Sequence, residues 1–170
     1  AKPQRILTLS MSTDEIMLGL VEPEKMAAVN QLLDDPVSSN VTELAQRVTK
    51  RISNPTAEQV AALQPDLVIV PDWGDLSIVP SLRELGIRVV VCKGAGNLAE
   101  IRETILLLAQ AAGEPDRGSL LLQKMDDKLA AIQAQVEKIP PEQRKTVVLI
   151  SLMSAYGGSG CSFDEACHYA

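Results

Sequence analysis

The stretch Leu63-Gln-Pro-Asp-Leu-Val-Ile-Val-Pro-Asp-Trp-Gly-Asp75 is an apolar run that ends in two acids around the only Trp of the chain. Pro65 disfavours helical geometry in the residue before it, so a helix that begins near Asn54 must stop at this point. The run from Asp66 to Pro71 is short, rich in β-branched residues and bounded by turn residues, which predicts a strand buried on both faces. The residues after it must then lie in a loop at the carboxyl end of that strand.

Apolar runs of this kind alternate with helical periodicity along the chain. The pattern predicts an α/β fold in three layers, with a parallel, Rossmann-like sheet covered by helices on both faces. The other expected strands are Arg5 to Ser10, Lys25 to Asn30, Ile87 to Cys92 and Thr146 to Leu152. The β-branched run Val89 to Val91 predicts a further strand with two buried faces.

Several expected helices have recognisable ends. The segment Ser12-Thr-Asp-Glu15 fits a capping box, so a helix should begin directly after the first strand. Asn54 is the expected cap of a second helix, with Pro55 in its first turn. Helices are also expected over Leu76 to Leu85 and over Asn97 to Ala112, and a glycine follows each of them.

The longest expected element is a helix from Asp116 to Ile139, with apolar residues at spacings of three and four. At ~1.5 Å per residue it would be ~36 Å long, which allows it either to bridge two bodies or to serve as an ordinary covering helix or coiled-coil arm. Pro140 and Pro141 end it, and a strand and a Gly-rich loop follow. We therefore expect an N-terminal lobe at 1–115, a linking helix at 116–139 and, at 140–170, the start of a second α/β lobe that this sequence cuts off.

Composition and charge exclude several classes of function. The chain has 170 residues, 46% of them apolar, and a formal charge of -6 without a Lys/Arg cluster, which argues against a nucleic-acid partner. No apolar run reaches the roughly 18 residues that a membrane span needs. One histidine, His168, and three cysteines without a Cys-x-x-Cys pair argue against a metal site, and no cofactor is expected. Cys92 should be buried, whereas Cys161 and Cys167 either pair or stay free.

The sequence lacks the motifs of common enzymes. It has no Gly-x-Ser-x-Gly elbow and no phosphate-binding loop, and its single histidine lies near the C-terminus. Asp72 and Asp75 could form an acid/base pair, but two acids in a surface loop are usually solvated turn residues. We therefore expect no enzyme.

One alternative interpretation is a signalling switch. Pro65 to Asp72, together with Lys93 after a later strand, superficially resembles the phospho-acceptor strand and lysine of two-component receiver domains. Receivers also need a pair of acids at the end of the first strand to hold Mg²⁺. Here that strand ends in Thr8-Leu-Ser10, and the next acids come only inside the following helix. A phospho-acceptor domain that uses Asp72 is thus the alternative.

Five segments form a series that covers nearly the whole chain: Thr8 to Ile16, Met26 to Pro36, the Asn-Pro-x-x-Glu and Leu-x-Pro-Asp-Leu-Val pattern of Asn54 to Val70, Leu85 to Val91, and Tyr156 to Tyr169. In this order they resemble the substrate-binding proteins of ABC importers, in the helical-backbone class that binds ferric siderophores, haem and cobalamin. The resemblance implies a shallow cleft between two lobes, a rigid joining helix and no chemistry on the ligand.

The resemblance also implies partners and a location. The ligand would be a metal chelate, with siderophore, haem and cobalamin left open, and the membrane partner would be an ABC permease. The protein would be extracytoplasmic, either periplasmic or a cell-surface lipoprotein, with its leader absent from this sequence. Its final segment could pair with a second copy through domain exchange.

The residues expected to bind the ligand lie in loops after the strands, where open parallel sheets hold their ligands. The resemblance implies that Trp73 stacks on a planar ligand, although it could instead only anchor its own turn. Ser12 could cap a helix or donate to the ligand, and Lys93 would offset anionic charge. The full expected set is Ser10, Met11, Ser12, Thr13, Asp72, Trp73, Gly74, Lys93, Ser154 and Tyr156.

Overall fold

A five-stranded parallel sheet forms the centre of the computed structural model, which describes residues 2–146. The strands lie in the order β3-β2-β1-β4-β5, and every neighbouring pair is parallel. Their bounds are Ile6–Thr8 for β1, Met26–Asn30 for β2, Arg51–Ile52 for β3, Leu67–Pro71 for β4 and Arg88–Cys92 for β5. The strand order reverses between β1 and β4, which is where open α/β sheets bind ligands.

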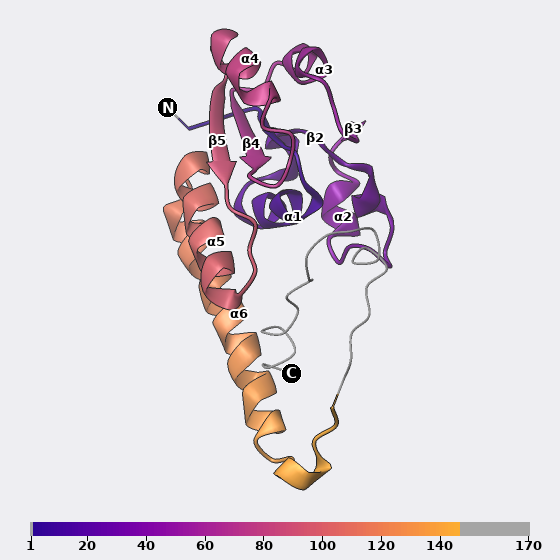
Figure 1. Cartoon of the computed structure of the whole chain (residues 1–170), viewed down its shortest axis with the longest axis vertical. Coiled ribbons are helices and arrows are strands. Elements are labelled where there is room, and N and C mark those ends of the chain that lie inside the picture. Colours follow the sequence, from indigo (N-terminus) through magenta and orange to yellow (C-terminus); the bar gives the residue numbers. More distant parts are fainter. Residues whose placement is uncertain (1, 147–170) are drawn as a thin grey trace.

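Helices cover both faces of this sheet (Figure 1). Helices α1 and α5 lie on one face, and α3 and α4 lie on the other. The α-helices are α1 Met11–Leu20, α2 Thr42–Ala45, α3 Ala57–Ala62, α4 Ile78–Glu84, α5 Leu98–Ala112 and α6 Pro115–Val136, and short 3₁₀ turns lie at Pro23–Lys25, Gln31–Asp34 and Pro141–Gln143. This arrangement confirms the expected three-layer α/β fold.

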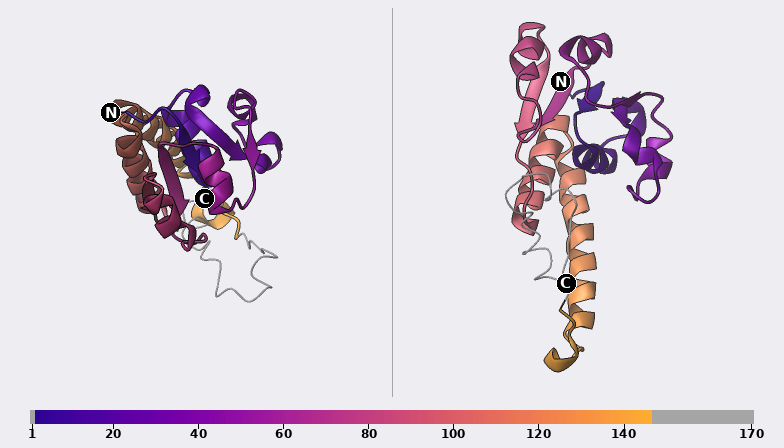
Figure 2. Two further views of the ribbon diagram at one scale, coloured as in Figure 1. Left: turned by 90° about the horizontal axis from the view of Figure 1, so that it is seen from above. Right: turned by 45° about the vertical axis from the view of Figure 1, so that its right-hand side comes forward.

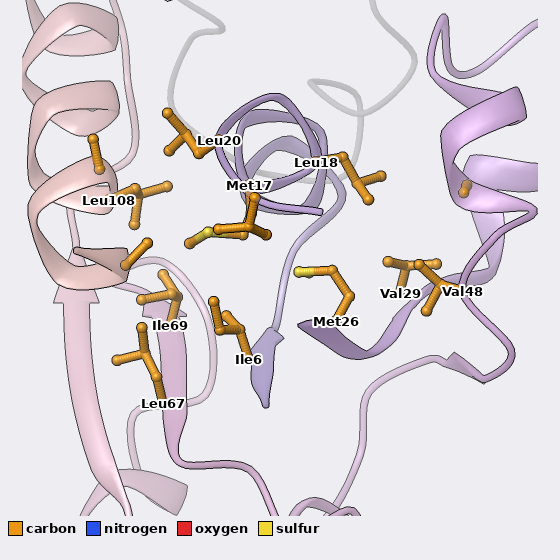
Figure 3. Close-up of a cluster of buried hydrophobic side chains, with 14 of the residues drawn as sticks. Ile6, Met17, Leu18, Leu20, Met26, Val29, Val48, Leu67, Ile69 and Leu108 are labelled. Atoms are coloured by element: carbon orange, nitrogen blue, oxygen red, sulfur yellow. The ribbon is translucent and has the colours of Figure 1, made fainter. Parts of the chain in front are cut away.

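Successive residues of the central strands enter two separate apolar clusters. Ile6, Leu67 and Ile69 lie with Met17 of α1 and Leu108 of α5 on one face (Figure 3). The residues between them, Leu7, Val68 and Val70, lie with Val60 of α3 and Leu82 of α4 on the other face. All of these side chains are buried. The expectation that β4 is buried on both faces is therefore confirmed.

Strand β5 differs from its expected burial. Val89 and Val90 are only half-buried, and Val91 is exposed. The prediction of two buried faces was wrong here because β5 is an edge strand, so the helices cover its faces only in part. Cys92, the last residue of β5, is buried as expected.

The start of α1 also differs from the prediction. Ser10, not Ser12, is the N-cap: it has an extended backbone (φ -150°, ψ 151°), and its Oγ accepts a hydrogen bond from the Thr13 amide. Ser12 already belongs to the helix, so it cannot cap it. Glu15 has no capping role and instead accepts a hydrogen bond of 2.6 Å from the Ser39 hydroxyl.

Helix α3 likewise begins later than predicted. Thr56 and Gln59 form the capping box, in which the Thr56 amide donates to Gln59 Oε1 at 2.9 Å and the Gln59 amide donates to Thr56 Oγ1 at 3.3 Å. Asn54 is not the cap because it lies in the left-handed region, with φ 44°, two residues before Thr56.

Helix α6 extends well beyond the rest of the described lobe (Figure 2). Its first turns are tightly anchored: a Cβ on Gly118 would lie only 2.5 Å from the Ala109 Cβ of α5. The Arg117 guanidinium donates to the Leu20 carbonyl at 3.2 Å and to the Glu22 carboxylate at 2.6 Å. A long helix is thus present where the sequence predicts one, and its linking role stays a prediction. The predicted strand from Thr146 to Leu152 lies almost wholly outside the described residues.

We expect Gly118→Ala to lower the free energy of unfolding by about 1–2 kcal/mol, because the added methyl group would force α6 away from α5. Alanine has a higher helix propensity than glycine, which by itself would stabilise α6. Only the contact with Ala109 can therefore make the variant less stable. Gly19→Ala is the matched control, since its methyl group would meet only the mobile end of Leu121 at 3.3 Å. Urea unfolding of both variants tests the prediction, which equal stabilities would contradict.

Candidate functional site

A cavity of about 630 Å³, here called the main cavity, lies beyond the carboxyl ends of β1, β4 and β5. Three loops and the starts of two helices line it. Its residues are Ser10, Ser12, Thr13, Glu15 and Ile16 after β1, Pro71 and Trp73 at the end of β4, Cys92 to Gly96 at the end of β5, and Ile101 and Thr104 on α5. The main cavity therefore lies at the point where the strand order reverses, as expected for an open parallel sheet.

Three hydroxyl groups lie together where α1 begins. Ser10 Oγ lies 2.6 Å from Thr13 Oγ1 and 3.3 Å from Ser12 Oγ, and Thr13 Oγ1 donates to the Ser10 carbonyl at 3.0 Å. Ser10 and Thr13 are buried, whereas Ser12 is exposed. Ser12 is thus the hydroxyl most accessible to a ligand, and the first amides of α1 lie beside it without intrahelical acceptors.

Trp73 is 66% exposed, although it is the largest apolar side chain of the chain. A Cβ on Gly94 would lie only 2.8 Å from its Cδ1 atom, so the Gly-rich loop after β5 contacts the edge of the indole. Trp73 belongs to neither of the two buried clusters. This position leaves a large aromatic surface open, which favours the stacking interpretation over the anchoring one.

Asp72 holds the Gly-rich loop in place. Its amide donates to the Cys92 carbonyl at 2.8 Å, and its Oδ1 accepts a hydrogen bond of 2.9 Å from the Gly94 amide. The carboxylate thereby joins the end of β4 to the loop after β5. In the described structure Asp72 does not line the main cavity, and its carboxylate instead contacts the loop that carries Lys93.

The main cavity contains one acid and one base, Glu15 and Lys93. Sequence reasoning missed Glu15 as a site residue because it assigned this side chain to a capping box. It also missed Ile16, Ile101 and Thr104, whose place in the cavity depends on how α1 and α5 pack. The sequence did contain one signal for Glu15. It lies three residues after Ser12, so the two side chains lie on the same face of the predicted helix.

A second, smaller cavity of about 240 Å³ lies at the same end of the sheet and is here called the side cavity. It shares Pro71 and Trp73 with the main cavity. Its other residues are Leu9, Asn54, Pro55, Val70, Gly74, Asp75 and Ile78. Val70 and Ile78 belong to the cluster on the α3 and α4 face, so Trp73 separates two cavities on opposite faces of the sheet.

A buried carboxyl group, Asp14, lies beneath the hydroxyl groups of α1. It is fully buried, Thr8 Oγ1 donates to its Oδ1, and the Asn30 amide donates to its Oδ2 at 2.7 Å. Burial raises the pKa of Asp14 to about 7, and the negative charge of Glu15 adds to this effect, while the two hydrogen bonds and Arg51 oppose it. Asp14 therefore joins β1, α1 and β2 behind the main cavity.

The structure brings five of the predicted site residues together in the main cavity, namely Ser10, Ser12, Thr13, Trp73 and Lys93. Gly74 lines the side cavity, and Met11 and Asp72 line neither of the two. Ser154 and Tyr156 lie outside the described residues. A binding role for the whole set stays a prediction.

Metal-ligating side chains do not gather in residues 2–146: no group of three or more His, Cys, Asp or Glu side chains there is placed to hold an ion. The Cys92 thiol lines the main cavity but is buried, and this burial raises its pKa. Within the same residues, no helix has the length and apolar character of a membrane span.

We expect Gly94→Ala to turn the indole of Trp73 away from its present position, because the new methyl group would lie 2.8 Å from Cδ1. The emission maximum of Trp73 in the unliganded protein should then shift. Gly96→Ala is the control, since its methyl group would meet only Glu100 Oε2 at 3.4 Å. Unchanged emission in Gly94→Ala would show that the loop does not hold the ring.

Comparison with known proteins places the chain in a family. The model of the periplasmic binding protein family matches residues 6–165, so the chain belongs to this family. A vitamin B12-binding protein from Vibrio parahaemolyticus is 26% identical over 136 residues, which are 78% of this chain and 46% of that protein. The chain thus spans about half the length of this relative.

Two solved structures share the fold. A possible iron-binding periplasmic solute-binding protein from Staphylococcus epidermidis superposes with a TM-score of 0.71 at 20% identity, over 83% of this chain and 54% of that one. A periplasmic heme-binding protein from Roseiflexus sp. RS-1 has a TM-score of 0.67 at 24% identity, over 80% of this chain and 51% of that one. The resemblance read from the sequence is thereby confirmed, the expectation of no enzyme agrees with a family of binding proteins, and the receiver alternative gains no support.

Proposed function

We propose that this chain forms the N-terminal lobe and linking helix of the solute-binding component of an ABC importer. The protein would capture a metal chelate, of the siderophore, haem or cobalamin kind, and deliver it to a permease in the membrane. Family membership supports this proposal, together with relatives and fold neighbours whose names include vitamin B12, iron and heme. In this proposal residues 1–115 form the lobe, 116–139 join it to the next lobe and 140–170 begin that lobe.

The observation that carries the proposal is the composition of the main cavity. Loops from three strands bring an open indole, a group of hydroxyls and one lysine to the same site, at the reversal point of the sheet. Its volume of about 630 Å³ lies within the usual range of roughly 300–1,000 Å³ for small-molecule sites. A second lobe that closes over the same rim would complete a site for a larger ligand.

Each part of the main cavity has a distinct role in binding. The open face of Trp73 stacks on the planar body of the chelate. The Ser12 hydroxyl and the first amides of α1 donate to oxygen atoms at the edge of the ligand, and the positive end of the helix dipole strengthens these bonds. Lys93 offsets negative charge on the ligand. Asp72 acts indirectly, because it fixes the loop that carries Lys93.

We further propose an extracytoplasmic location, because the permease of an importer receives its ligand from outside the membrane. Attachment to the cell surface as a lipoprotein, and pairing of two copies through domain exchange, are predictions of the same proposal. Size-exclusion chromatography with light scattering tests the second of these, since domain exchange requires a stable dimer.

Titration of the full-length protein with cyanocobalamin, haemin and a ferric siderophore tests the function. Calorimetry should detect saturable 1:1 binding of one of these ligands, accompanied by quenching of the Trp73 emission. Incubation with acetyl phosphate and Mg²⁺, followed by mass spectrometry, should leave Asp72 unmodified. Absence of binding to all three chelates would contradict the proposal, and a stable aspartyl phosphate would revive the receiver interpretation.

A further inference from the structure

The side cavity has no role in the function proposed so far. It lies on the opposite face of the sheet from the main cavity, and Trp73 and Pro71 form a wall common to both. A ligand that covers the indole therefore reaches the opening of the side cavity as well. With about 240 Å³, the side cavity is too small for a planar macrocycle, but it can hold one side group of such a ligand.

The walls of the side cavity are mostly apolar, with Leu9, Val70 and Ile78 among them. Two polar side chains, Asn54 and Asp75, stand among these apolar groups. Such a set suits a short methylene stem that ends in a polar group. The side-chain amide of Asn54 and the carboxylate of Asp75 would then bind the polar end of that group.

Asp75 has one carboxylate oxygen to spare. Its Oδ1 accepts hydrogen bonds from the Ser77 amide at 2.9 Å and from the Ser77 hydroxyl at 2.6 Å. Its Oδ2 accepts none from the residues that the structure describes. The bonds from Ser77 hold the pKa of Asp75 below its usual value, so the group is an anion at neutral pH. Asp75 therefore offers a negatively charged acceptor and repels other carboxylates.

Asn54 is held in an unusual backbone conformation. Its φ is 44°, in the left-handed region that asparagine adopts more readily than most residues other than glycine. Thr56 caps helix α3 in its place, and within residues 2–146 the Asn54 amide makes no hydrogen bond. The Asn54 side chain is exposed to solvent and makes no hydrogen bond in the described lobe, so its amide is free to bind a ligand.

We propose that the side cavity binds a neutral carboxamide group of a ligand whose planar body lies on Trp73 in the main cavity. The carboxamide N–H donates to Asp75 Oδ2, and its carbonyl oxygen accepts from the Asn54 amide. A carboxylate in the same place would meet the charge of Asp75 and lose the donated hydrogen bond. This inference rests on the proposed function and narrows its ligand to a chelate with peripheral carboxamides, such as a corrinoid, over one with peripheral carboxylates, such as haem.

The test uses cyanocobalamin and its separated monocarboxylic acids, in each of which one peripheral amide has been hydrolysed. In the full-length protein, one of these acids should bind about tenfold more weakly than cyanocobalamin, because it loses the hydrogen bond that the carboxamide donates to the Asp75 carboxylate and meets the charge of that carboxylate instead. Asp75→Asn should remove most of this difference, since an asparagine oxygen still accepts from Ser77 and the loop is preserved. Asp116→Asn, which removes the same charge from the exposed start of α6, should leave the difference unchanged.

A second variant tests the amide separately. Asn54→Gly keeps the positive φ without strain and should weaken cyanocobalamin binding about three- to tenfold while the protein stays folded. Equal affinity of all the acids and cyanocobalamin for the unmodified protein, or tighter binding of haemin than of cyanocobalamin, would overturn the inference but not the function. Failure of all three chelates to bind would instead overturn the proposed function.

Discussion

Trp73→Ala should weaken binding of the chelate by about thirtyfold in Kd. One face of an indole buries on the order of 80 Å² against a planar ligand, which is worth about 2 kcal/mol at ~25 cal/mol per Å², and about 1.4 kcal/mol changes Kd tenfold. The indole is 66% exposed in the described structure, so this surface is available without rearrangement of the core. Calorimetric titration of the full-length protein with the chelate that binds best gives the two dissociation constants directly.

The same variant should leave the fold intact, because Trp73 belongs to neither buried cluster. Its free energy of unfolding should change by less than about 0.5 kcal/mol, as for most exposed positions. Trp73→Phe is the matched control and should retain part of the affinity, since a smaller aromatic ring still stacks. If Trp73→Ala binds as tightly as the unmodified protein, the ring only anchors its own turn.

Asp14→Asn should stabilise the protein relative to the unmodified chain as the pH rises. The pKa of Asp14 is about 7 in the folded protein against an ordinary value of 3.8, so the folded state binds this proton more tightly than the unfolded chain does. Its contribution to stability is fully present below about pH 3.8 and is lost as the pH rises through about 7. Each pH unit between these values is worth about 1.4 kcal/mol.

Between pH 5 and pH 8 the difference in unfolding free energy between the variant and the unmodified protein should therefore grow by about 2–3 kcal/mol in favour of the variant. The asparagine mimics the protonated acid: its oxygen accepts from the Asn30 amide, its N–H donates to Thr8 Oγ1, and the Thr8 hydroxyl then donates to the Ser10 carbonyl, 3.4 Å away. Urea unfolding at both pH values provides the measurement, with the exposed Asp116→Asn as control. A difference that does not change with pH would mean that Asp14 is already ionised at pH 5.

The central part of the fold could be predicted because local signals and burial agree there. The stretch from Leu67 to Pro71 is apolar at every position, and the structure buries all five residues as a central strand. The end of α5 was also predictable, since Gly113 adopts the left-handed conformation (φ 71°) that the sequence pattern implied. Where local geometry alone requires a particular residue type, the sequence is sufficient to predict the element and its end.

The remaining elements depend on contacts between distant segments. Strand β3 has only two residues, Arg51 and Ile52, and these pair with the end of β2, so no periodicity could have indicated it. The two misplaced helix caps each had more than one suitable residue within a few positions, and backbone geometry decided between them. The sequence could not show that β5 would lie at the edge of the sheet in the described lobe. Its burial was therefore overestimated.

Part of the candidate site could be predicted from the topology of the sheet. A parallel sheet delivers all its strand ends to one edge, which is why the hydroxyls after β1, Trp73 after β4 and Lys93 after β5 could be grouped from sequence. Glu15 could have been found from its spacing after Ser12 on the same helix but was assigned to a capping box. The side cavity could not be predicted, since it depends on the left-handed backbone of Asn54.

The close contact between Gly118 and Ala109 fixes the direction in which helix α6 extends from the lobe. Helix α6 has 22 residues, or about 33 Å at ~1.5 Å per residue, and it is held near its base by this contact and by Arg117. Because α6 is this long, a tilt of the helix by about 5° at its base would displace its far end by about 3 Å. A methyl group at position 118 that tilts α6 by this amount would therefore displace the residues after this helix by several ångströms.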